Sequence, residues 1–197
     1  MAPRTYDEIA PHYDKAIRPF ERWFLKKLRE ATLRQLPAGA RTIELGAGTG
    51  LNFLYYPTNA AGVATEPSRG MLNIAREKPR PARVSLVQSS AERLPFESES
   101  FDAAFATLVF CSLASPTEAF NELRRVVKRG GSVVLLEHVR PHGLLGVLFD
   151  LLNLITVPLF DDHFNRRTAS SAQLAGLRVL RVEERLLGII NLIVCRV

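Results

Sequence analysis

Short apolar runs separated by polar or glycine-containing turns recur after residue 40 of this 197-residue chain. Apolar runs of this length, bounded by turn residues, are typical of buried strands. They predict strands near residues 41–45, 61–65, 84–88, 102–107 and 132–137, with helical stretches between them. The alternation of strand and helix predicts an α/β fold with a doubly wound, mainly parallel sheet.

The segments on either side of this core have other patterns. Residues 6–36 have helical periodicity in two pieces divided near Pro19, since proline suits the first turn of a helix. Residues 144–160 are strongly apolar, and we expect a polar helix after them, then terminal strands near 177–184 and 189–196. The whole chain is expected to form a single domain.

Charge and cysteine content indicate the kind of partner and the cell compartment of the protein. The net charge of +6 and the pI near 9.7 indicate an anionic partner, either nucleic acid or a membrane surface with acidic lipids. The basic residues are scattered and no stripe of aromatic and basic residues is present, so we expect no nucleic acid. Two cysteines are too few for a disulfide framework, and the first residues have no apolar signal region, which favours a reducing cytoplasm.

Residues 41–50 form the most informative stretch, a short apolar strand that leads into a turn with glycines at 46, 48 and 50. Glycine lets the backbone approach a ligand closely. The spacing differs from the G-x-G-x-x-G of dinucleotide sites, and Glu44 before it is placed to meet a cationic group, which favours S-adenosylmethionine over NAD. Glu66 ends the next strand, where a carboxylate can accept both ribose hydroxyls. A tight turn without a ligand and a solvated strand end are the alternatives.

The segment Glu44-Leu-Gly-Ala-Gly-Thr-Gly50 resembles the first motif of class I methyltransferases, and Ser89-Ser-Ala-Glu-Arg-Leu-Pro-Phe96 resembles the segment that holds the adenine. Residues 50–57, 107–112 and 137–140 together resemble a subgroup of the methyltransferase type 11 family that includes bacterial phospholipid N-methyltransferases and quinone-precursor C-methyltransferases. The chain departs from the pattern at Ser90, which replaces an acidic residue, and at Arg129, which replaces a proline.

This resemblance covers residues 41–140 and implies a Rossmann-like class I methyltransferase fold, with S-adenosylmethionine as cofactor and S-adenosylhomocysteine as product. It divides the domain into an N-terminal helical cap (1–36), a cofactor-binding core (37–140) and acceptor-side helices with terminal strands (141–197). The cofactor-binding residues that it implies are Glu44, Gly46, Ala47, Gly48, Gly50, Asn52, Glu66, Pro67, Ser68, Met71, Ser90, Ala91, Glu92, Thr107 and Leu108.

Methyl transfer depends on placing the acceptor in line with the methyl group and needs no dedicated nucleophile. An amine acceptor must lose a proton, so a nearby base helps, and Tyr13 and His138 are the candidates. Both have structural alternatives, a helix-end tyrosine and a histidine that packs in a loop. The resemblance adds support for Tyr13, because Tyr13 lies in a segment similar to the one that closes over the cofactor in the family.

Further residues bear on the acceptor. Arg140, Arg166 and Arg167 are candidates to hold a phosphate, although arginines on a basic protein are usually solvated. Pro141 breaks the helical pairing of the two nearest histidines, so we expect no metal.

The acceptor itself is expected to be a lipophilic small molecule. The apolar residues 143–160 are too interrupted for a convincing membrane span, and they suit either an acceptor pocket or a buried helix. Apolar residues recur at helical spacing in residues 17–29, with basic residues between them. Such a helix can either bind an anionic bilayer surface or pack its apolar face on the sheet. We expect a cytoplasmic enzyme, peripheral at the inner face of the membrane, that N-methylates phosphatidylethanolamine. The alternatives are C-methylation of a ubiquinone or menaquinone precursor, S-methylation of a small thiol, and a basic nucleic-acid-binding module.

Overall fold

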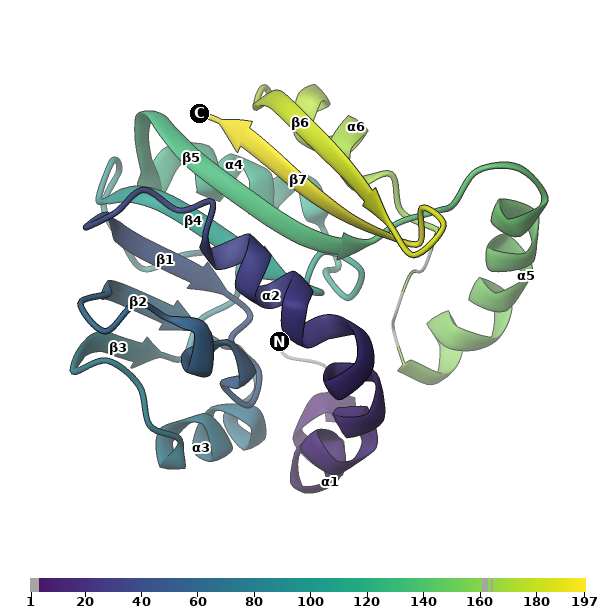
Figure 1. Cartoon of the computed structure of the whole chain (residues 1–197), viewed down its shortest axis with the longest axis horizontal. Helices are drawn as coiled ribbons and strands as arrows, with labels where there is room; N and C mark the ends of the chain where they lie inside the picture. The colour runs from purple at the N-terminus through teal and green to yellow at the C-terminus, as the bar shows by residue number, and fades with distance from the viewer. Residues whose placement is uncertain (1–3, 161–162, 164) are drawn as a thin grey trace.

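The computed structural model describes residues 4–160, 163 and 165–197. A seven-stranded sheet in the order β3-β2-β1-β4-β5-β7-β6 forms its centre, with helices on both faces (Figure 1). β7 is antiparallel to both of its neighbours, β5 and β6, and all other neighbouring strands pair in parallel. This arrangement confirms the predicted doubly wound α/β fold. The strands are β1 (Arg41–Leu45), β2 (Ala61–Thr65), β3 (Arg83–Val87), β4 (Phe101–Thr107), β5 (Val127–His138), β6 (Arg178–Arg185) and β7 (Ile190–Arg196).

The strand ends agree with the apolar pattern except in β5, which begins five residues before the predicted start at 132. The early part of β5 reaches back along β4, where Phe101 pairs with Val127 before the register shifts and Ala103 pairs with Ser132. Two glycines, Gly130 and Gly131, lie within this irregular stretch. A glycine-rich turn therefore becomes part of the strand because β4 supplies a partner on each side of it.

The N-terminal residues form one continuous helical run rather than two pieces. α1 (Arg4–Phe20) passes through Pro19 and is followed by the π-helical turn η1 (Glu21–Leu25) and by α2 (Lys26–Leu33). Proline removes one backbone donor and crowds the preceding turn. The helical run continues through Pro19, and the α-helical geometry changes to a π-helical turn at Glu21, so the predicted division is a change of helix type and not a break between two helices.

The other helices are η2 (Leu51–Tyr55), α3 (Arg69–Glu77), α4 (Pro116–Val126), α5 (Gly143–Phe160) and α6 (Thr168–Leu174). η2 is a short 3-10 turn where a helix was expected, and Pro57 soon after it prevents its extension. Residues 88–100, all of them described, form turns and no helix between β3 and β4. In Figure 1, α2 lies on the near face of the sheet, whereas α4 and α6 lie behind it.

The core lies on both faces of the central strands. Phe110 and Phe120 stack on one face, with ring centroids 4.4 Å apart, and the other face packs Leu25 and Leu33 of the N-terminal run against β4 and β5. Both cysteines are buried, and burial raises the pKa of the Cys195 thiol to about 12. The carboxyl ends of β1, β2, β4 and β5 are left to meet at one edge of the sheet, where open α/β sheets bind ligands.

Candidate cofactor and acceptor site

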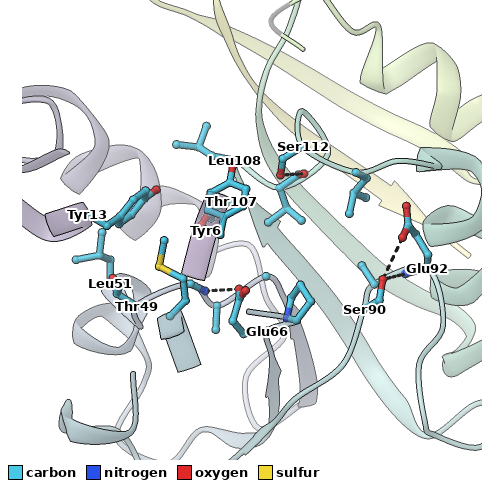
Figure 2. Close-up of a pocket in the computed structure, with 18 of the residues that line it drawn as sticks. Tyr6, Tyr13, Thr49, Leu51, Glu66, Ser90, Glu92, Thr107, Leu108 and Ser112 are labelled. Atoms are coloured by element: carbon cyan, nitrogen blue, oxygen red, sulfur yellow. Dashed lines mark hydrogen bonds between the residues drawn. The ribbon is translucent and has the colours of Figure 1, made fainter. Parts of the chain in front are cut away.

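A cavity of about 1040 Å³, counted to its open mouth, lies at this edge of the sheet. It is lined by loops that follow β1, β2, β3 and β4 and by residues of α1 and α2. In Figure 2, Tyr13 and Leu51 lie at one end, Ser90 and Glu92 lie at the other, and Glu66 lies between them. The predicted site residues that line the cavity are Tyr13, Gly46, Ala47, Gly48, Glu66, Pro67, Met71, Ser90, Ala91, Glu92, Thr107 and Leu108.

The glycine turn after β1 forms one wall of the cavity. Gly46 and Gly48 have φ angles of +62° and +55°, which side-chain-bearing residues rarely adopt. A Cβ atom at Gly46 would lie 2.6 Å from a methyl group of Val109, whereas one at Gly48 would have no neighbour within 4 Å. Gly46 is therefore required by packing, and the bare backbone of Gly48 faces open space that a ligand can occupy.

Glu66 places a buried carboxylate beside this turn. One oxygen accepts a hydrogen bond from the Gly48 amide at 2.8 Å and the other accepts one from the Ser68 amide at 2.8 Å. Only 7% of Glu66 is exposed, and burial raises its pKa to about 7 although the two amide hydrogen bonds oppose the shift. The nearby carboxylates of Glu44 and Asp7 raise it further. Each oxygen keeps a lone pair for a ligand hydroxyl.

The far end of the cavity is formed by the turn after β3. The Ser90 hydroxyl donates to Glu92 at 3.1 Å and accepts from the Glu92 amide at 3.2 Å. Glu92 also accepts from the Ser115 amide at 2.6 Å, which ties this turn to the start of α4. Ser90 thus already has partners on its own turn, and Ala91 beside it is buried at 4% exposure.

The helix α1 covers the cavity and is held there by two aspartates. Asp7 accepts from the Ser68 hydroxyl at 2.6 Å and from the Gly70 amide at 2.8 Å, and these bonds lower its pKa. Asp14 accepts from the Thr49 hydroxyl and pairs with Lys78, both at 2.5 Å. Tyr6 and Tyr13 of this helix line the cavity (Figure 2), and the sequence had indicated only Tyr13.

A network of polar side chains lies under the glycine turn. Arg29 of α2 lines the cavity, is 4% exposed, and donates to Asn52 at 3.0 Å and to Thr107 at 2.7 Å. Its Nε atom faces Glu21 at 3.0 Å. Sequence reasoning missed Arg29, although it stands four residues from both Leu25 and Leu33, on one buried helical face. A lone arginine at a buried position of an amphipathic helix was the available signal.

Glu44 belongs to the same network and does not line the cavity. Its fully buried carboxylate accepts hydrogen bonds from the Asn52 amide at 2.5 Å and from the Tyr56 hydroxyl. Burial raises the pKa of Glu44, while Asn52, Tyr56 and the charge of Arg29 lower it. Glu44 therefore supports the floor of the site from below. Three other predicted residues also lie outside the lining, namely Gly50, Asn52 and Ser68.

The loop after β4 forms the remaining wall, and Glu137 of β5 fixes its shape. Both oxygens of this fully buried carboxylate accept backbone amides of the loop, from Val109 at 3.1 Å and from Phe110 at 3.0 Å. Leu108 has a φ angle of +59°, and its amide bonds to Leu136 at 2.7 Å. A strained residue held in place at the cavity wall is typical of functional sites.

The candidate base and phosphate ligands after β5 are not brought to the lining. His138 is the last residue of β5 and lies opposite Ile190. It follows Glu137, whose carboxylate binds the loop after β4, and because successive strand residues point to opposite faces, His138 points away from that loop. Arg140 is engaged by Asp150 of α5, with 2.8 Å between Nη2 and the carboxylate. Arg166 donates to the Leu113 carbonyl at 2.5 Å, and Arg167 is exposed before α6. Among the described residues, no group of three or more histidine, cysteine or acidic side chains is arranged to hold a metal.

The chain is similar in sequence to known methyltransferases. A family model described as a methyltransferase domain matches residues 43–135. A phosphatidylethanolamine N-methyltransferase of Cereibacter sphaeroides is 31% identical over 139 residues, covering 64% of this chain and 68% of the relative. A demethylmenaquinone methyltransferase of Clavibacter sepedonicus is 33% identical over 140 residues, covering 69% and 57%. The chain thus spans less than two thirds of some of the curated relatives that it matches.

Solved structures agree on the fold. A chain of the complex between the Haloferax volcanii Trm112 methyltransferase activator and a methyltransferase superposes with a TM-score of 0.77 at 17% identity, covering 97% of this chain and 96% of that one. The [4+2]-cyclase SpnF shares the fold at a TM-score of 0.70 and 18% identity, covering 86% and 80%, so the fold alone does not fix the reaction. With the family match and the relatives above, the chain belongs to the class I S-adenosylmethionine-dependent methyltransferases.

Proposed function

We propose that the protein transfers the methyl group of S-adenosylmethionine to a lipophilic, membrane-associated acceptor, with the ethanolamine nitrogen of phosphatidylethanolamine as the leading case. The observation that carries the proposal is the pairing of Glu66 with the bare backbone of Gly48 in one cavity. The carboxylate of Glu66 can accept hydrogen bonds from ribose hydroxyls, and the backbone at Gly48 leaves room for the amino acid part of the cofactor beside it.

The residues of the cavity fit this cofactor from end to end. Glu66 accepts the ribose hydroxyls, and the turn at Ser90 and Ala91 flanks the adenine. Gly46, Ala47 and Gly48 pass beside the amino acid part, whose carboxylate Arg29 complements in charge from the floor of the cavity. Bound S-adenosylmethionine supplies an electrophilic methyl group.

The protein's own part in the chemistry is placement and proton removal. Thr107 and Leu108 form the wall where the donor and the acceptor meet, and the aspartate contacts of α1 keep Tyr6 and Tyr13 over the cavity and exclude water. Tyr13 is the candidate proton-transfer residue that lines the cavity, so we assign to it a relay: its oxygen accepts the proton of the ammonium group, directly or through a water, while its own O–H proton passes to water at the open mouth. Leu108, Val109 and Leu113 give the acceptor an apolar wall.

C-methylation of a quinone precursor is the second candidate. It is supported by the demethylmenaquinone methyltransferase relative and by a ubiquinone/menaquinone biosynthesis C-methyltransferase of Syntrophotalea carbinolica, 35% identical over 147 residues, 69% of this chain and 60% of the relative. Both candidate acceptors are lipophilic, so both place the enzyme at a membrane surface. No helix among the described residues is long and apolar enough to cross a bilayer, and we propose peripheral attachment at the inner face.

Product analysis separates the candidates. The purified protein is incubated with S-adenosylmethionine and, in parallel, with vesicles that contain phosphatidylethanolamine, with a demethylated quinone and with a small thiol, and the products are identified by mass spectrometry. Methylated ethanolamine lipid, formed about a hundredfold more slowly with Tyr13→Phe, supports the leading case. Product only from the quinone or the thiol replaces it. Binding of S-adenosylmethionine without any product contradicts the proposed acceptor class.

A further inference from the structure

The described part of α5 exposes large apolar side chains, while two polar side chains of the helix contact the rest of the protein. Asp150 pairs with Arg140, and Asn153 donates to Asn165 at 2.6 Å. Asn153 is 8% exposed. A helix on the surface of a water-soluble protein has the opposite arrangement, because apolar side chains gain free energy from leaving water.

The outer side of α5 is an aliphatic stripe. Leu144 and Leu154 are 89% and 73% exposed, and Leu148 and Leu151 are both 58% exposed. At 100° per residue the stripe occupies one continuous face of the helix. Its described members are Leu144, Val147, Leu148, Leu151, Leu152 and Leu154.

The position of α5 makes this stripe accessible. The helix follows β5 and stands away from the sheet in Figure 1, at the end of the sheet that α1 also flanks. The cavity opens at the same end, where the parallel strands finish. Between Gly143 and Phe160 the sequence has a single charged residue, Asp150, and Arg140 neutralises it on the inner side. The stripe therefore carries no charge that an apolar medium would penalise.

A second exposed apolar segment, η1, bears on the kind of partner. Trp23 and Phe24 of η1 are 76% and 46% exposed, and four exposed cations lie close to them in the chain. Tryptophan among basic residues is typical of segments that lie at an anionic lipid surface. The exposed cations near them are Arg18, Arg22, Lys26 and Lys27.

A second copy of the chain fits the stripe less well. Stable protein interfaces use about 20 to 30 residues a side, whereas the described part of the stripe has six residues of one projecting helix. The cations beside Trp23 would also repel their counterparts in a second copy. A bilayer needs no matching surface, and its anionic headgroups complement these cations.

We infer that α5 is an interfacial helix whose aliphatic stripe inserts into an anionic bilayer, beside the mouth of the cavity. The inference rests on the proposed function in one respect, the membrane location of the acceptor, and it names the element that makes the contact. The helix lies in the surface of the bilayer, since no described helix can span it. An acceptor lipid then has only to move from the bilayer into the adjacent cavity.

The test compares two variants of equal charge on vesicles of phosphatidylcholine with and without phosphatidylglycerol. Leu148→Asp/Leu151→Asp changes the stripe, and Leu174→Asp/Leu180→Asp changes two exposed leucines of α6 and β6, which are 91% and 49% exposed. Neither S-adenosylmethionine nor an ethanolamine lipid is present, so failure here is distinct from failure of the methylation assay. We expect the stripe variant to bind anionic vesicles at least about tenfold more weakly than the wild type, with the control variant unchanged.

Three results would overturn the inference: equal binding by the stripe variant, no vesicle binding by the wild type, or weakening by both variants. Loss of a dimer in the stripe variant, without any vesicle binding, assigns the stripe to a second copy instead. A second measurement does not depend on the folding of that variant. Trp23→Phe/Leu151→Trp moves the single indole into α5, and its fluorescence should be quenched by brominated acyl chains; an unquenched indole contradicts insertion.

Discussion

Affinity for the cofactor should depend on pH through Glu66, whose pKa is raised to about 7 by burial. In the site that we propose, the ionised carboxylate accepts both ribose hydroxyls, whereas the protonated form loses one acceptor. One pH unit below the pKa only about a tenth of the carboxylate is ionised, which corresponds to about 1.4 kcal/mol. The dissociation constant of S-adenosylmethionine should therefore rise about tenfold between about pH 8 and about pH 6.

The same shift has the opposite effect on the stability of the protein without cofactor. The folded-state pKa lies above the ordinary carboxyl value of 4.5, so the folded protein holds a proton that the unfolded chain has released. The contribution of Glu66 to stability is present below about pH 4.5 and is lost as the pH rises through about 7. The loss amounts to roughly 3 kcal/mol. Cofactor binding and apo stability thus change in opposite directions between about pH 6 and about pH 8.

Titration calorimetry at several pH values, in buffers of different ionisation enthalpy, measures both the affinity and the protons released. Glu66→Gln serves as the control, because its binding should be weak and independent of pH. Asp7 and Glu44 are the other carboxylates near Glu66. The lowered pKa of Asp7 keeps it ionised throughout the range, whereas burial raises the pKa of Glu44, so the Glu66→Gln control also reports any pH dependence that comes from Glu44. A wild-type dissociation constant that is the same at about pH 6 and about pH 8 would refute the reasoning.

Three further predictions concern single side chains. Gly48→Ala should fold but bind S-adenosylmethionine about tenfold more weakly by calorimetry, because its φ of +55° is strained for alanine and its Cβ enters the cavity; unchanged affinity would contradict this placement. Arg29→Met should lower the free energy of unfolding in urea by about 3 to 5 kcal/mol, because the charge of Glu21 and the oxygen of Thr107 lose their buried partner. Tyr13→Phe should lower kcat about a hundredfold while the cofactor affinity measured by calorimetry stays the same; parallel losses of both would instead indicate a part in cofactor binding.

The sheet and the cofactor side of the site follow from local sequence signals. Apolar runs locate the strands within a few residues, and a glycine turn after β1 with a carboxylate after β2 places Gly48 and Glu66 together, since neighbouring parallel strands finish at the same edge. These signals are local because each depends on a strand and the turn directly after it. Eleven of the predicted residues that line the cavity lie at the end of a strand or soon after it, and the twelfth, Tyr13, comes from α1.

The roles of Arg29, Arg140 and Pro19 could not be predicted from the sequence, because they depend on contacts that the local pattern does not contain. Arg29 reaches the cavity because α2 crosses the face of β4 and β5, a docking angle that periodicity does not contain. Arg140 looks available in the sequence, but the turn after it brings Asp150 back to its guanidinium. Pro19 has the sequence pattern of a helix start, and the pattern does not indicate the π-helical turn that follows it.

Because both cysteines are buried, a single introduced cysteine can be labelled to measure the motions of this molecule. Cys111 and Cys195 are 3% and 0% exposed, so reagents reach neither thiol easily, and Cys195, with a pKa of about 12, has almost no reactive thiolate at neutral pH. A cysteine introduced at an exposed position such as Leu151 or Lys15 would then be the site that a maleimide or nitroxide reagent labels. Distances between α1 and α5 can be followed by spectroscopy without replacing either native thiol.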